Sequence, residues 1–121
     1  MEIVSKILIG LVALEHLYIL YLEMFAWETL GKKTFKGALA PELFKPTKGL
    51  AANQGLYNGF LAAGLIWSFC ISDPIWSKNV ALFFLSCVSV AGLFGALYNR
   101  AIFFKQALPA LISLICVYLF Q

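Results

Sequence analysis

Charged residues are scarce in this sequence, and that scarcity excludes most soluble proteins. They make up 12% of the 121 residues, whereas hydrophobic residues make up 62%. A soluble domain carries roughly a quarter charged residues and about half apolar ones. One small core cannot bury so much apolar surface, and the mean hydropathy of +0.88 agrees with this. The composition therefore predicts an integral membrane protein.

Cysteine and histidine are also few, which argues against a disulfide framework and a metal cluster. The isolated Cys70, Cys87 and Cys116 all fall within apolar stretches, where cysteine serves as a small apolar side chain. The first apolar stretch ends without a small-residue cleavage site, so we predict a retained helix. A phosphate loop, a nucleophile motif and a soluble basic domain are absent too, so soluble catalysis and nucleic-acid binding have no support.

What the sequence does have is four apolar stretches, each long enough to cross a bilayer. Crossing takes about 20 mainly apolar residues in a helix, because lipid offers no partner for unpaired backbone groups. We predict one membrane domain over residues 1–121, an all-α bundle of four transmembrane helices. The helices are expected at about 7–27, 51–71, 80–97 and 102–120.

Basic residues are distributed unevenly over the predicted joints. The first joint has five lysines, and the third has Arg100 with Lys105 close behind. The opposite face has Lys6 and Lys78. The positive-inside rule therefore predicts that the first and third joints are cytoplasmic and that both termini lie outside.

The first joint also contains an apolar pattern. Phe35, Leu39 and Leu43 recur at a spacing of four among the lysines, and Pro41 interrupts them. We expect a short amphipathic segment there, lying on the lipid surface. The lysines would favour anionic headgroups, and a purely topogenic role explains them equally well.

Small residues recur at every fourth position on two predicted helices. Gly55, Gly59 and Ala63 do so on the second helix, and Gly92 with Ala96 on the third. Such stripes let helix backbones approach closely, within one chain or between copies of a homo-oligomer. Pro109 in the fourth helix is expected to bend it or to mark its proper beginning.

Three ionisable residues interrupt the first apolar stretch: Glu15, His16 and Glu23. On a helix, His16 and Glu23 lie within about 20° of the same face, and Glu15 points about 100° away. A charge at mid-bilayer costs about 2.5–3.5 kcal/mol, so such residues normally face the interior of a bundle. We predict these three as the candidate catalytic residues.

Further polar residues gather at the predicted cytoplasmic ends of the helices. The candidate ligand-binding residues are Tyr21, Asn53, Gln54, Tyr57, Asn58, Tyr98, Asn99, Arg100, Lys105 and Gln106. We predict a polar pocket that opens toward the cytoplasm and is lined by all four helices. Glu23 and Lys105 are the preferred pair because their depths match, and His16 is paired with Glu15 of another copy or with Asn58. A network that only holds the helices together explains the amides equally.

Three phrases, "ALEHLYILYLEMFAW", "LAANQGLYNGFLAAGLIW" and "AGLFGALYNRAIFFKQALPALISL", resemble a family of small bacterial membrane proteins known as a domain of unknown function. The likeness covers nearly the whole chain. It implies a four-helix protein of the bacterial inner membrane and supplies no activity. The matching signature positions are Glu15, His16, Tyr18, Tyr21, Glu23, Asn53, Gln54, Tyr57, Asn58 and Gln106.

A fainter likeness is to the membrane-associated enzymes of eicosanoid and glutathione metabolism. They share four helices, a long cytoplasmic first joint and polar residues at the start of the second helix. With Asn53 in the place of their asparagine, Gly49 and Leu56 replace the arginine and the glutamate. These departures remove the charges that would hold glutathione, so the likeness extends to architecture alone.

Three classes of function fit these observations. The first is the binding or conversion of a small lipophilic molecule of lipid or quinone type, with His16 transferring protons in the enzyme version. The second is a proton-coupled exporter, because a membrane-embedded carboxylate such as Glu15 resembles that of the small multidrug resistance proteins. The third is an accessory subunit of a membrane complex. The sequence specifies no cofactor and leaves open whether any reaction is catalysed.

Overall fold

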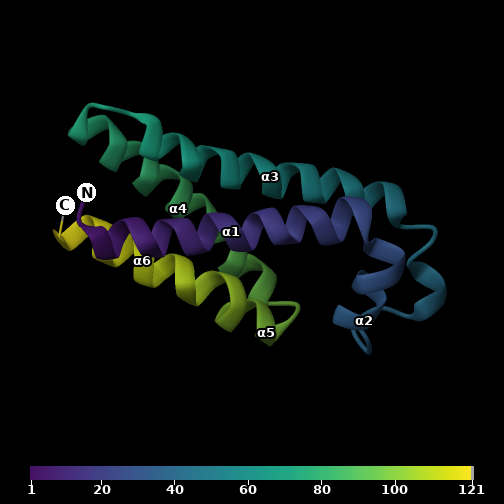
Figure 1. Ribbon diagram of the computed structural model, residues 1–121. Helices are drawn as coiled ribbons and strands as arrows, with labels where there is room; N and C mark the ends of the chain where they lie inside the picture. Colours follow the sequence, from purple (N-terminus) through teal and green to yellow (C-terminus); the bar gives the residue numbers. More distant parts are fainter. Residues whose placement is uncertain (121) are drawn as a thin grey trace. The chain divides into compact units, whose positions relative to one another are not determined.

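The computed structural model describes residues 1–120, and these form helices and turns without a β-strand (Figure 1). The all-α prediction is confirmed. The four long helical segments are α1 (Ile3–Phe25), α3 (Lys48–Cys70), α4 (Pro74–Ala96) and the run from Arg100 to Phe120. That last run consists of α5 (Arg100–Ile102), a π-helical turn η3 (Phe103–Ala107) and α6 (Leu108–Phe120). Each of the four lies where an apolar stretch predicts a helix.

Three of these segments are long and apolar enough to cross a membrane: α1, α4 and the run Arg100–Phe120. α3 has the same length as α1, 23 residues. Its first half contains Asn53, Gln54 and Asn58, which lower its hydropathy. Three candidate spans are therefore identified on length and composition, and the crossing of α3 remains a prediction.

The chain divides into two compact units, which are described separately. The first unit combines Met1–Leu14 with the chain from Leu61 onward, and the second is Glu15–Phe60. In the first unit, buried side chains from α1, α3, α4 and α6 pack into one apolar core. Its buried members are Ile9, Val12, Ala13, Leu65, Ala81, Leu85, Val88, Ala110 and Val117.

α4 begins earlier than the predicted start at residue 80, because Asp73 caps it. The Asp73 carboxylate accepts hydrogen bonds from the backbone N–H groups of Ile75 and Trp76, at 2.9 and 3.0 Å. Pro74 occupies the first helical position, where its missing N–H costs nothing. Most of the segment "SDPIWSKN" therefore belongs to the first turns of α4. The connection between α3 and α4 is shorter than predicted, so that prediction was wrong.

α4 and α6 pack side by side in the first unit, and η3 lies against α4 (Figure 1). A Cβ atom at Gly92 would lie 2.7 Å from the backbone nitrogen of Ala107. The backbone approach predicted for Gly92 therefore occurs within one chain. Pro109 is the second residue of α6 and follows the π-helical turn η3 within one helical run; a bend at this proline remains a prediction.

In the second unit, α1 and α3 are joined by a segment we call the connector, residues 26–48. It contains a π-helical turn η1 (Trp27–Gly31), α2 (Lys32–Thr34) and a 3-10 turn η2 (Pro41–Leu43). These elements are short, and an amphipathic segment lying on the lipid surface remains a prediction for this part of the chain. Phe35 and Leu39 are half-buried, and Leu43 is exposed.

Candidate functional site

Close contact between α1 and α3 creates the site in the second unit. A Cβ atom at Gly55 would lie 2.9 Å from the Cβ atom of Glu23 and 2.8 Å from Cγ of Met24. One turn further along α3, a Cβ atom at Gly59 would collide with the Leu20 side chain. The glycines that were predicted to face another helix therefore face α1, and they bring the backbone of α3 against Glu23.

Glu23 and Asn58 form the polar centre of this contact. The Asn58 Nδ2–H group donates to Oε1 of Glu23 at 2.7 Å, and the same amide nitrogen donates to the backbone oxygen of Gln54 at 3.2 Å. Glu23 is 6% exposed, and Asn58 is half-buried. The pair therefore joins one buried carboxylate and one amide across two mainly apolar helices. A hydrogen bond to a charged acceptor is shorter and stronger than one between neutral groups.

The pair presents acceptors rather than donors to any further group. Asn58 uses both amide hydrogens, one on Glu23 and one on the Gln54 carbonyl. An ionised carboxylate has acceptor atoms only. The other acceptor atoms of the pair are Oε2 of Glu23 and Oδ1 of Asn58. With Glu23 ionised, the site suits a hydroxyl, an amine or a cation.

The other two candidate catalytic residues lie on α1 within the same unit. His16 is fully buried, and Glu15 is half-buried. His16 lies two helical turns from Glu23 on nearly the same face. Burial of an imidazole and a carboxylate on one helix agrees with the prediction that these side chains turn away from lipid, while their roles in catalysis remain predictions.

Several predicted ligand-binding residues are not drawn into this centre. Within the second unit, the exposed members of the set are Tyr21, Asn53, Gln54 and Tyr57. The Tyr57 ring instead packs edge-on against Phe60, at 5.7 Å between ring centroids. The polar centre in this unit is consequently narrower than the predicted set, and it rests on one amide of the three in α3.

Two of the candidate residues in the first unit, Asn99 and Tyr98, have local structural roles. The Asn99 side chain accepts from the backbone N–H of Ala101 at 3.0 Å and so caps α5. Tyr98 packs against Phe94 and is 80% exposed, and Arg100 and Lys105 are exposed as well. Gln106 lies in η3 and is half-buried. A Glu23–Lys105 pair and a pocket lined by all four helices would join the two units, and both remain predictions.

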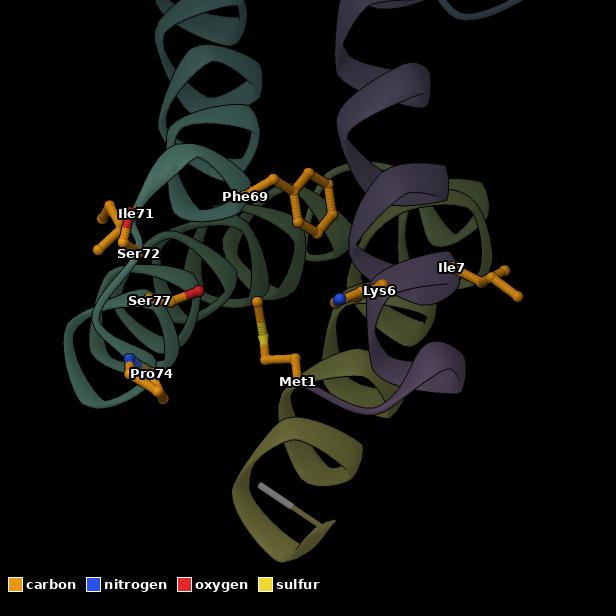
Figure 2. A pocket seen from close by; sticks show the side chains of 8 residues that line it. All are labelled: Met1, Lys6, Ile7, Phe69, Ile71, Ser72, Pro74 and Ser77. Carbon is orange, nitrogen blue, oxygen red and sulfur yellow. The ribbon is translucent and has the colours of Figure 1, made fainter.

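Sequence reasoning missed a hollow at the end of the first unit where the chain begins. Its volume is about 540 Å³. It is lined by Met1, Lys6, Ile7, Phe69, Ile71, Ser72, Pro74 and Ser77. Figure 2 shows the Lys6 and Met1 side chains directed into the space between the helices. The Ser77 hydroxyl donates to the Ser68 backbone oxygen at 2.7 Å. Lys6 adds a charged side chain to a hollow that both apolar and polar residues line.

Comparison with known families and proteins agrees with the likeness in the sequence. Residues 10–118 match a family described as protein of unknown function, DUF1304. The uncharacterized protein YpaA of Lactococcus lactis subsp. lactis (strain IL1403) is 33% identical over 124 residues, which cover 95% of this chain and 97% of that protein. No solved structure matches at a significant level.

These matches name no enzyme of eicosanoid or glutathione metabolism, so that fainter likeness remains a prediction. The resemblance to a bacterial family of unknown function is confirmed. Because the family match extends over most of the sequence, the chain belongs to the DUF1304 family of proteins of unknown function.

Proposed function

We propose that this protein is a four-span membrane protein in which the Glu23–Asn58 pair binds the polar head of a small lipophilic molecule. The burial of a hydrogen-bonded carboxylate between two apolar helices carries the proposal. An ionisable residue costs about 2.5–3.5 kcal/mol at the centre of a bilayer, and Glu23, near the end of α1, costs less than that. A leucine there would still insert more easily, so the acid is a candidate for a functional role.

The acceptor atoms of the pair indicate the kind of molecule. Oε2 of Glu23 and Oδ1 of Asn58 would accept from a hydroxyl or an amine, which a lipid headgroup or a reduced quinone provides. An oxidised quinone offers acceptors only and fits less well. The apolar side chains of α1 and α3 around the pair would hold the hydrocarbon part, as in most sites for small lipophilic molecules.

A lipophilic cation is the second candidate ligand, because a carboxylate also pairs with positive charge. That reading corresponds to the proton-coupled exporter predicted from the sequence. It requires Glu23 or Glu15 to exchange a proton for the cation during each cycle. Proteoliposomes with an imposed proton gradient would then accumulate such a cation. If they do not, the exporter is excluded and the hydroxyl- or amine-bearing ligand remains the candidate.

The direct test is to identify what copurifies with the protein. Wild type, Glu23→Gln and Glu42→Gln are each purified in discs of native membrane, and the extracted small lipophiles are quantified by mass spectrometry. Glu42 is an exposed acid in η2 and provides the matched control. We expect one class of hydroxyl- or amine-bearing molecule to be enriched with wild type and Glu42→Gln, and to fall at least tenfold with Glu23→Gln. Identical extracts from all three proteins would refute the proposal.

A further inference from the structure

The connector is a folded structure built around one tryptophan. The indole Nε1–H of Trp27 donates to Oγ1 of Thr47 at 2.9 Å, which ties the two ends of the connector together. The Trp27 ring lies 5.6 Å from the ring of Phe35 and 5.0 Å from that of Phe44, between centroids. Phe44 is 1% exposed. These contacts give the connector a small apolar centre of its own.

Local features fix the path of the backbone around this centre. Gly37 has a φ of +87°, a conformation that side-chain-bearing residues rarely adopt, and it allows the chain to reverse direction. The Thr47 hydroxyl donates to the Leu43 backbone oxygen at 2.7 Å and so holds the acceptor that Trp27 uses. In Figure 1 the chain turns away from the axis of α1 where that helix ends and passes through α2 before it returns to α3. The connector therefore holds its side chains in defined positions.

The charge of the whole protein is concentrated on this structure. The connector has five lysines and two glutamates, a surplus of three positive charges, which equals the formal net charge of +3 for the full chain. The remaining residues have four basic and four acidic side chains, so their charges cancel. All five lysines of the connector are exposed: Lys32, Lys33, Lys36, Lys45 and Lys48.

We propose that the connector binds the anionic headgroups of lipids in the leaflet it adjoins. Each lysine close to an anionic membrane surface contributes about 1 kcal/mol. A scaffold that already fixes the backbone positions of the lysines reduces the conformational entropy lost on binding. Orienting a protein in the membrane requires only the charges, whereas the Trp27–Phe44–Thr47 cluster organises them. The proposal does not involve Glu23 and is independent of the proposed function.

Lipid binding by the purified full chain tests this proposal. The protein in a neutral detergent is titrated with phosphatidylglycerol or with phosphatidylcholine of the same acyl chains, and bound lipids are counted by native mass spectrometry. We expect tighter binding of phosphatidylglycerol. The double variant Lys36→Gln/Lys45→Gln should weaken that binding by about 30-fold, which corresponds to two lysines at about 1 kcal/mol each. The control Lys6→Gln/Lys78→Gln removes two lysines outside the connector and should change it less than threefold.

A second variant separates an organised surface from loose charge. Thr47→Val removes the acceptor of the Trp27 indole and leaves all five lysines, and we expect it to weaken phosphatidylglycerol binding several-fold. Equal affinity for the two lipids, or an equal loss in the control double variant, would overturn the proposal. So would an unchanged affinity in Thr47→Val, or displacement of the lipid by inorganic phosphate at the same concentration, which would indicate a site for soluble anions.

Discussion

Replacing Asn58 alone should destabilise the protein more than replacing both Asn58 and its hydrogen-bond partner Glu23. In Asn58→Leu, Glu23 stays 6% exposed and loses the donor at 2.7 Å from Oε1. A hydrogen bond to a charged group contributes about 1.5–3 kcal/mol in soluble proteins, and interhelical bonds in membranes reach about 1.7 kcal/mol. We therefore expect Asn58→Leu to lower the free energy of unfolding by about 2 kcal/mol.

The partner substitution should behave differently because it removes the charge itself. Glu23→Leu leaves the Asn58 amide half-buried, with its bond to the Gln54 carbonyl intact. We expect a change in unfolding free energy within about 1 kcal/mol, because the buried carboxylate is removed and Asn58 keeps its hydrogen bond to the Gln54 carbonyl. Replacing both partners of a buried polar pair by apolar groups is often neutral or stabilising. The double variant Glu23→Leu/Asn58→Leu should then be more stable than Asn58→Leu alone, with a coupling energy of about 1–2 kcal/mol.

The assay is reversible unfolding in mixed micelles of increasing dodecyl sulfate content, followed by far-ultraviolet circular dichroism. Glu42→Leu combined with Asn58→Leu is the control pair, because Glu42 is exposed and its effect should simply add. A coupling energy below about 0.3 kcal/mol between Glu23 and Asn58 would refute the reasoning, since distant sites are additive within that margin. A double variant that regains stability and loses its copurifying lipophile would assign the pair to ligand binding and not to assembly.

Three further predictions concern the packing, the connector and the orientation. Gly92→Ala should lower the free energy of unfolding by about 1–3 kcal/mol, because the added Cβ atom would lie 2.7 Å from the backbone of η3. The control Gly10→Ala, which has open space around the added Cβ atom, should not lower the free energy of unfolding in the same micelle assay. Trp27→Phe keeps a ring but loses the hydrogen bond that closes the connector, about 1 kcal/mol, and trypsin should cleave the connector faster. In a cysteine-free background, Lys33→Cys should react with an impermeant thiol reagent only in inverted membrane vesicles, and Lys78→Cys only in intact cells; the reverse pattern would invert the predicted orientation.

The positions of the four long helices were readable from the sequence because apolar runs of this length have few alternatives in lipid. The exact ends of the helices were harder to predict from the sequence. The start of α4 at Pro74 depends on Asp73 accepting two backbone hydrogen bonds, and the polarity of the residues after it hid this capping signal. The fold of the connector was not readable at all. It depends on contacts between Trp27 and residues as distant in the sequence as Thr47. The spacing of apolar residues along the chain does not reveal such contacts.

The members of the candidate site were readable in part, but their pairing was not. Glu23 was predicted because it is an ionisable residue in an apolar stretch, and Asn58 was one of several polar residues predicted in α3. The predicted partner of Glu23 was Lys105, chosen because the two residues have similar predicted depths in the membrane. Rotation of α3 about its axis decides which amide meets α1. The close approach at Gly55 and Gly59 fixes that rotation and turns Asn58 toward Glu23. The glycine stripe was a signal for the face of α3 that meets α1, and it borders both Gln54 and Asn58.

The π-helical turn Phe103–Ala107 has a consequence for how the length of this chain can vary. A π turn holds one residue more than an α turn would need to reach the same point. Deleting one residue between Phe103 and Ala107 would let the turn tighten to α geometry, so that every side chain of α6 would keep its angular position. A deletion inside α6 itself would rotate everything beyond it by about 100°. Homologues that are one residue shorter in this span should therefore have lost it at the wide turn and should run through this region as an uninterrupted α-helix.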